Sequence, residues 1–122
     1  MTDEQIREML ATKVMGWKLG AYQDEKWWFE TDVDGYSWRP YKVSDWQPDT
    51  NIGQVMRCAE KWCFDNDGTY KLEGGEYGGE GKFLYRAIFI VWMYKSQDYK
   101  CYVGEGTKEQ AITNALLEAV KK

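Results

Sequence analysis

The residues best suited to chemistry in this chain are aromatic and cationic side chains, because histidine is absent. The 122 residues include seven Trp, nine Tyr and four Phe but no His. The chain therefore lacks the commonest general base and zinc ligand, and it cannot form a Ser-His or Cys-His nucleophile pair. Aromatic rings and guanidinium groups together recognise planar or anionic groups by stacking and charged hydrogen bonds. The composition favours binding over catalysis, and we expect no cofactor and no metal.

Five of the seven tryptophans lie within residues 17–46. The ordinary interpretation is that they form core, because aromatic side chains bury a large area. Trp28 should face away from its strand neighbours, and Trp38 and Trp46 border turns, so we expect part of this surface to meet a partner or a planar ligand. The candidate binding residues are Trp28, Trp38, Arg39, Trp46, Arg57 and Arg86.

Arg86 stands out because it lies on the mostly apolar face of an expected strand. We expect its stem to pack and its guanidinium to pair with a carboxylate from a neighbouring element. The alternative is that Arg86 binds an anion beside a tryptophan. Paired carboxylates such as Asp32 and Asp34 could do acid–base work, but a catalytic carboxylate needs burial or a close like charge, and these two are expected in exposed turns.

Charge and hydropathy limit the partners and the location. Sixteen basic and twenty acidic residues give a net charge of −4, and no basic stripe is present, so we expect no nucleic-acid partner. The longest apolar stretch, residues 87–93, is too short to cross a membrane, and the N-terminus is polar. Cys58, Cys63 and Cys101 are expected to be free thiols in a reducing cytoplasm, with Cys63 buried and Cys58 more accessible.

Three helices are indicated by apolar periodicity and capping residues. The first spans 3–15 after a Thr2–Gln5 capping box, and the last begins at Thr107, whose box partner is Gln110. The second spans about 49–64, with Asp49 or Thr50 near its start. Its expected apolar face is Ile52, Val55, Met56, Ala59, Trp62 and Cys63.

The strands are indicated by alternation and turn signals. Residues 26–31 and 36–41 flank Asp34-Gly35, a strong hairpin signal, and Pro40 marks the second arm as an edge strand or loop. A strand at 69–73 leads into a glycine-rich loop at 74–81. Residues 83–94 form the expected central strand, apolar on both faces over 87–93, with 99–103 as its antiparallel partner. The order predicts one α+β domain, a three-layer α-β-α sandwich with a mainly antiparallel sheet and three helices on its two faces.

Three segments resemble the phage α-β-α sandwich domain family, small proteins of phages and prophages. They are 10–17 (LATKVMGW), 46–61 with Trp46-Gln47-Pro48-Asp49 and Glu60-Lys61, and the Thr107–Ile112 helix start. The resemblance implies a fold and a phage or prophage setting, but no catalytic residues. The chain departs from the family pattern in its aromatic load at 17–46 and in the loop at 74–81.

These observations lead us to expect a non-enzymatic binding protein in the host cytoplasm. It would inhibit or sequester a host component, either a host protein or a small anionic metabolite. The alternative is a structural or assembly protein of a phage particle, and the third is a histidine-free enzyme. The aromatic excess at 22–46 also leads us to expect a homo-oligomer, most simply a symmetric homodimer.

Overall fold

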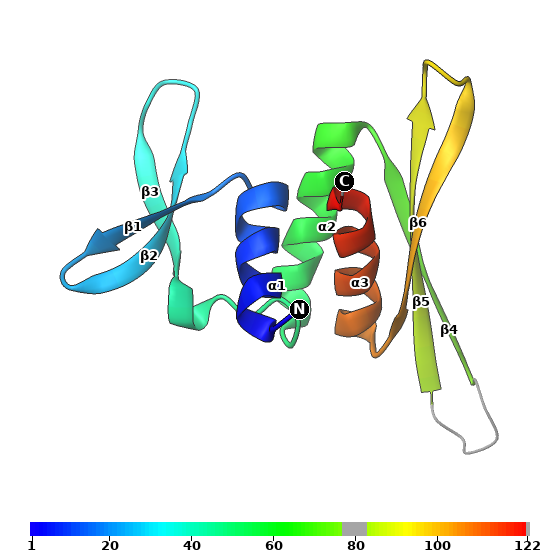
Figure 1. The fold of residues 1–122 in the computed structure, drawn as a ribbon, viewed down its shortest axis with the longest axis horizontal. Helices are drawn as coiled ribbons and strands as arrows, with labels where there is room; N and C mark the ends of the chain where they lie inside the picture. Colours follow the sequence, from blue (N-terminus) through cyan, green and yellow to red (C-terminus); the bar gives the residue numbers. More distant parts are fainter. Residues whose placement is uncertain (77–82, 122) are drawn as a thin grey trace.

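The computed structural model describes residues 1–76 and 83–121, and it places three helices between two antiparallel sheets (Figure 1). Sheet A joins β1 (Lys18–Tyr22), β2 (Glu25–Thr31) and β3 (Ser37–Lys42), and sheet B joins β4 (Thr69–Glu76), β5 (Phe83–Met93) and β6 (Asp98–Gly106). The α+β class is confirmed. The three-layer sandwich is not confirmed, because the strands form two sheets. The loop expected at 74–81 lies mostly outside the described residues.

The first helix begins as expected but changes its winding. Thr2 and Gln5 form the capping box of α1 (Asp3–Met9), and the chain continues as a π-helical turn, η1 (Leu10–Val14). The Trp46 indole donates to the Arg7 carbonyl at 2.9 Å. The π-helical turn is closed by the Met15 amide, which donates to the Leu10 carbonyl at 3.0 Å. The sequence predicted one α-helix over 3–15, whereas the structure divides this segment into α1 and η1.

The other two helices are α2 (Ile52–Asn66) and α3 (Lys108–Val120). Thr107 and Gln110 form the expected capping box of α3. Asn51, rather than Asp49 or Thr50, caps α2 by accepting from the Gln54 amide. None of the helices in the described part of the chain is long and apolar enough to cross a membrane.

The predicted apolar face of α2 was wrong in two places. Ile52 is 40% exposed and Cys58 is fully buried, whereas Cys63 is half-buried and packs against the core as Met56 does. The buried stripe includes Val55 and Ala59 as expected, but it turns toward Cys58. The reason is that α2 contacts both η1 and α3, so its buried side is decided by two helical neighbours. The expected order of thiol accessibility, Cys58 before Cys63, is therefore reversed.

Sheet B packs against α3 through one face only. Ala87 and Phe89 of β5 are fully buried on that face. A Cβ at Gly104 of β6 would lie 2.3 Å from the Ala111 carbonyl oxygen and the Ala115 amide nitrogen, so glycine permits the close approach of α3. β5 is the central strand, as predicted. Cover on both of its faces is not found among the described elements: all three helices lie on one side of sheet B (Figure 1).

Sheet A contains the predicted hairpin and one unpredicted strand, β1. In the β2–β3 turn the Asp32 carboxylate accepts from the amides of Asp34 and Tyr36, and Gly35 has a φ of +90°. β3 is an edge strand, which tolerates Pro40 as predicted. Sheet A stands away from the helices, on the side opposite to sheet B (Figure 1).

Candidate binding surface

Sheet A is joined to the helices by four aromatic side chains, which we call the junction cluster: Trp17, Trp28, Tyr41 and Trp46. The Trp17 and Trp46 rings meet edge to face at 4.7 Å, and the Tyr41 ring lies 5.1 Å from that of Trp46. Trp28 and Trp46 are only 4% and 1% exposed. We expected both to lie at a binding surface, but they are core residues. They are buried because they lie where sheet A meets the helices, in one core cluster with residues of η1, α2 and α3.

Arg57 of α2 also belongs to this junction. Its Nη1 donates to the Tyr41 hydroxyl at 3.2 Å, and its guanidinium carbon lies 5.5 Å from the Tyr41 ring centre. The contact links α2 to β3, so Arg57 has a structural role on the helix side of sheet A.

Arg86 is far from the junction, on sheet B. Its Nε and Nη2 lie 2.9 and 2.8 Å from the same carboxylate oxygen of Glu105, on β6. The expected pairing with an acid from a neighbouring element is confirmed. The helices lie between sheet B, which carries Arg86, and sheet A, which carries Trp28, Trp38 and Arg39 (Figure 1).

Arg39 lies on the face of sheet A that points away from Trp28. Its guanidinium carbon lies 3.3 Å above the centre of the Tyr22 ring and 5.4 Å from that of Trp27. Lys42 pairs with Trp27 in the strand register and so shares this face. The Phe29 ring covers Gly20, where a Cβ would approach it to 2.5 Å. We call this set the Arg39 platform: Tyr22, Trp27, Phe29, Arg39 and Lys42.

Arg39 differs from the other three arginines in its hydrogen bonding. Arg7 is held by both carboxylate oxygens of Asp49 at 2.7 and 3.1 Å, and Arg57 and Arg86 have the partners named above. Within residues 1–76 and 83–121, no hydrogen-bond acceptor lies within reach of Arg39. A guanidinium that stacks on a ring uses its flat face, so its in-plane N–H groups remain available for an anion.

The charge of this face is positive although the chain as a whole is acidic. The strand register places Lys18 and Glu25 on the face that carries Arg39 and Lys42. Three cations against one carboxylate leave a charge of +2 there. The Lys42 ammonium lies 2.8 Å from Glu25, and that hydrogen bond raises the pKa of Lys42. The local field therefore favours an anionic partner.

Trp38 lies on the opposite face of sheet A. It pairs with Glu30 in the register and is 45% exposed. Val33 in the nearby turn is 102% exposed, and Tyr36 just after the turn is 73% exposed. The tip of the β2–β3 hairpin thus presents apolar side chains to solvent, separate from the Arg39 platform.

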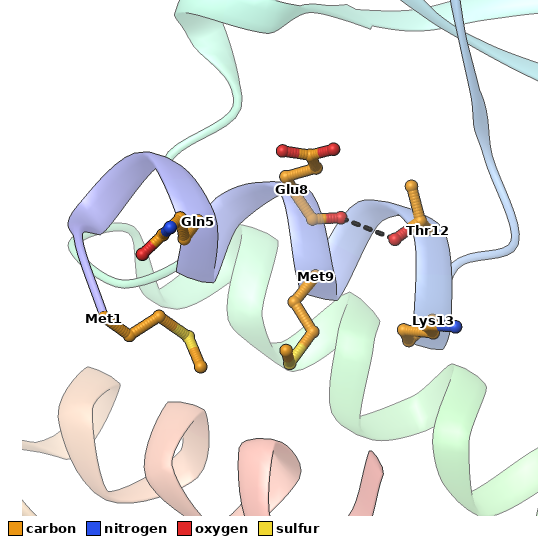
Figure 2. Close-up of a pocket in the computed structure, with 6 residues that line it drawn as sticks. All are labelled: Met1, Gln5, Glu8, Met9, Thr12 and Lys13. Carbon is orange, nitrogen blue, oxygen red and sulfur yellow. Dashed lines mark hydrogen bonds between the residues drawn. The ribbon is translucent and has the colours of Figure 1, made fainter. Parts of the chain in front are cut away.

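Several hollows adjoin α1. One, of about 520 Å³, is lined by Met1, Gln5, Glu8, Met9, Thr12 and Lys13 (Figure 2). The Thr12 hydroxyl donates to the Glu8 carbonyl at 2.8 Å, and the Glu8 carboxylate points away from Met9 (Figure 2). These six side chains do not bring an acid and a base together. A second hollow, of about 400 Å³, lies between α1 and the side chains of Lys26, Trp28 and Ser44. Arg7, which also lines it, is already bound to Asp49.

No group of three or more potential metal ligands occurs in the part of the chain that the structure describes. No family model, curated protein or solved structure matches this chain. The resemblance to the phage sandwich family therefore stays a prediction. The surface has to be interpreted from its own geometry.

Sequence reasoning did not assign Phe29 and Lys42 to a site, and it counted Tyr22 and Trp27 only as members of an aromatic cluster. The missing information was β1, without which the platform has only two strands. Its turn uses Gln23 and Asp24, both with positive φ (50° and 64°). Such two-residue turns usually carry Asn-Gly or Asp-Gly, so this one gave a weak signal.

Proposed function

We propose that this chain is a non-enzymatic binding protein that uses the Arg39 platform to hold an acidic side chain of a partner protein. The observation that carries the proposal is the Arg39 guanidinium, which is stacked 3.3 Å above Tyr22 and has no acceptor among the described residues. Stacking holds the group in place before binding, so little side-chain entropy is lost when a carboxylate arrives. A carboxylate can accept two parallel N–H bonds from such a fixed guanidinium.

The shape of the surface favours a protein over a small metabolite. Small-molecule sites are concave and enclose most of their ligand, whereas the platform is one face of a three-stranded sheet. Tyrosine, tryptophan, phenylalanine and arginine are the residue types enriched at the centres of protein interfaces. The platform combines all four types within three strands.

The proposal includes a biological setting that the resemblance suggests. We propose that the protein originates from a phage or prophage, acts in the cytoplasm of the host and inhibits a host component. The platform supports this as a means of attachment, because occupying an acidic surface of a host protein requires no catalytic group.

The test compares partner capture by three immobilised chains: the native protein, Arg39→Gln and Arg86→Gln. The third is the matched control, because it removes the same charge from the other sheet. We expect a bacterial lysate to yield one protein that the native and Arg86→Gln chains retain equally. Charged hydrogen bonds contribute about 1.5–3 kcal/mol, so Arg39→Gln should weaken its binding roughly 10- to 100-fold, and 0.5 M NaCl should release it.

Three outcomes would contradict the proposal. Equal capture by the native and Arg39→Gln chains would show that the platform is not the binding surface. A small anion released on heat denaturation, detected by mass spectrometry and absent from Arg39→Gln, would make the ligand a metabolite. Retention of an oligonucleotide instead of a protein would assign the positive face to nucleic acid.

A further inference from the structure

No described element covers the outer face of sheet B, and this face differs in character from the Arg39 platform. The strand register places alternate residues of β4, β5 and β6 on the side away from α3. Its apolar members are Ile88, Ile90, Trp92, Tyr99, Cys101 and Val103. Tyr99 is 65% and Val103 is 44% exposed, and the Trp92 and Tyr99 rings meet at 4.8 Å. An apolar patch of this kind marks an interaction surface.

The charges on this face are balanced and already paired within the chain. Lys71 lies 3.0 Å from Glu73, and Arg86 lies 2.8 Å from Glu105. Two cations and two carboxylates leave the described part of this face without net charge, although the whole chain carries −4. A strongly charged partner would gain little at this face, whereas a second copy of the same face would not be repelled.

We propose that two copies of this chain form a symmetric dimer by packing the outer faces of their B sheets together. A two-fold axis lets the same apolar patch serve on both subunits. Sheets that pack face to face interleave their side chains at a separation of about 10 Å, and the central Ile88, Ile90 and Val103 are short enough for this. The dimer does not depend on the proposed function, and it leaves the Arg39 platform of each copy free.

The size of the face indicates a weak dimer. Three strands at about 4.8 Å spacing and the rows from residue 84 to residue 92 cover about 14 Å by 27 Å, or roughly 400 Å² in projection. Interfaces of standard size bury about 800 Å² per partner, and transient complexes bury less. We therefore expect monomer at low micromolar concentration and dimer at several hundred micromolar.

Analytical ultracentrifugation of the native chain and of Val103→Lys tests the dimer. A lysine at this half-exposed position would reach water in the monomer but would lie against a second lysine or apolar surface in the dimer. We expect at least tenfold weaker dimerisation. The matched control is Val33→Lys, at the exposed tip of sheet A, which should dimerise like the native chain. A native chain that is monomeric at 500 µM would overturn the proposal, and so would equal dimerisation of the two variants.

Cys101 provides a measurement that does not depend on any variant. Its exposed thiol lies on the dimer face, opposite Ile90. We expect its rate of maleimide labelling to fall as the protein concentration rises from 1 to 500 µM, and 0.5 M NaCl should leave this protection unchanged because the face has no net charge. A labelling rate that does not change with concentration would overturn the proposal. Platform binding should be lost in that salt, so the two proposals can fail separately.

Discussion

The two sheets have the same number and direction of strands, but they are held to the molecule in different ways. Sheet B lies against α3 along β5 and β6, with Ala87 and Phe89 buried and Gly104 in contact with the helix backbone. Sheet A is held by the junction cluster and projects beyond it (Figure 1). A sheet held by a helix along its length is fixed by backbone fit, whereas a sheet held by a few rings depends on those rings.

The outward faces of the two sheets also differ in charge. The platform of sheet A carries a charge of +2 and an arginine without an acceptor in the described chain, whereas the outer face of sheet B is neutral with paired charges. This difference in charge underlies our two proposals: an acidic partner surface for sheet A and a second copy of the chain for sheet B.

The largest effect is expected at the junction cluster. Trp46→Ala removes a ring that is 1% exposed and also removes the hydrogen bond to Arg7. We expect it to lower the free energy of unfolding by about 4 kcal/mol, as for other buried tryptophans. Trp92→Ala, on the outer face of sheet B, is the control and should cost about 1 kcal/mol. Urea denaturation measures both, and equal losses would contradict the view that sheet A depends on its rings.

Two glycines test how each sheet is held. A Cβ at Gly104 would meet the α3 backbone, which cannot move without displacing the helix, so Gly104→Ala should cost about 3 kcal/mol. A Cβ at Gly20 would meet only the Phe29 ring, which can rotate. Gly20→Ala should therefore change stability by less than about 1 kcal/mol, since alanine is also better than glycine within a strand. A larger loss at Gly20 would show that the platform side chains are packed as tightly as the core.

The features that depend on contacts within a few residues were predicted from the sequence. The capping boxes at Thr2 and Thr107 and the Asp34-Gly35 turn are satisfied by bonds within a few residues, and all three are confirmed. The π-helical winding of residues 10–14 was not predicted, because the apolar spacing of this segment fits an α-helix equally well. The division of the strands into two sheets is a property of the whole chain.

The candidate binding residues could likewise be identified only in part from the sequence. In the sequence Arg39 and Arg57 are equivalent, whereas Arg86 stands out by its position on an apolar strand face. Only the fold shows that Arg39 has no acceptor among the described residues. The placement of Arg39 depends on the irregular register between Trp28 and Glu30 and on the unpredicted β1, which supplies Tyr22. Pairing of Arg86 was predictable because a strand neighbour had to satisfy it, but the identity of Glu105 required the register of β6.

The buried Cys58 thiol of α2, in the helical layer between the sheets, should make the free energy of unfolding depend on pH. Burial raises the pKa of the Cys58 thiol from 9.0 to about 12. Above pH 9 the unfolded thiol loses its proton while the folded one keeps it, so stability should fall by about 1.4 kcal/mol per pH unit toward pH 12 and be unaffected below pH 8. Cys58→Ala should lack this part of the alkaline decrease, and Cys101→Ala, at an exposed thiol, should retain it.

Thiol modification near neutral pH provides a second measurement for the same layer. We expect Cys101 to react first, Cys63 next and Cys58 last, because their side chains are exposed, half-buried and buried. Identical alkaline slopes for the two cysteine variants, or early modification of Cys58, would show that the helical layer opens more readily than the sheets.

The smallest effects on stability are expected for the two arginines that distinguish the sheets. Arg39→Gln removes a cation–π contact, which contributes about 0.5–1 kcal/mol at an exposed position. Arg86→Gln removes an ion pair whose side chains are 40% and 59% exposed, and such pairs contribute about 0.2–1 kcal/mol at low salt.

Salt should distinguish the contributions of the two arginines. The ion pair is screened, so the cost of Arg86→Gln should vanish in 0.5 M NaCl, whereas the loss from the Arg39 stack should remain, since part of that contact is dispersion between two flat groups. Urea denaturation at 20 mM and 0.5 M NaCl measures both costs. A loss above 2 kcal/mol for Arg39→Gln would show that this guanidinium holds sheet A together, and a group that the fold needs in one position would then be a poor choice for a partner's carboxylate. A loss below 1 kcal/mol leaves Arg39 as a residue that the fold does not require, and its aromatic support then has its explanation in binding.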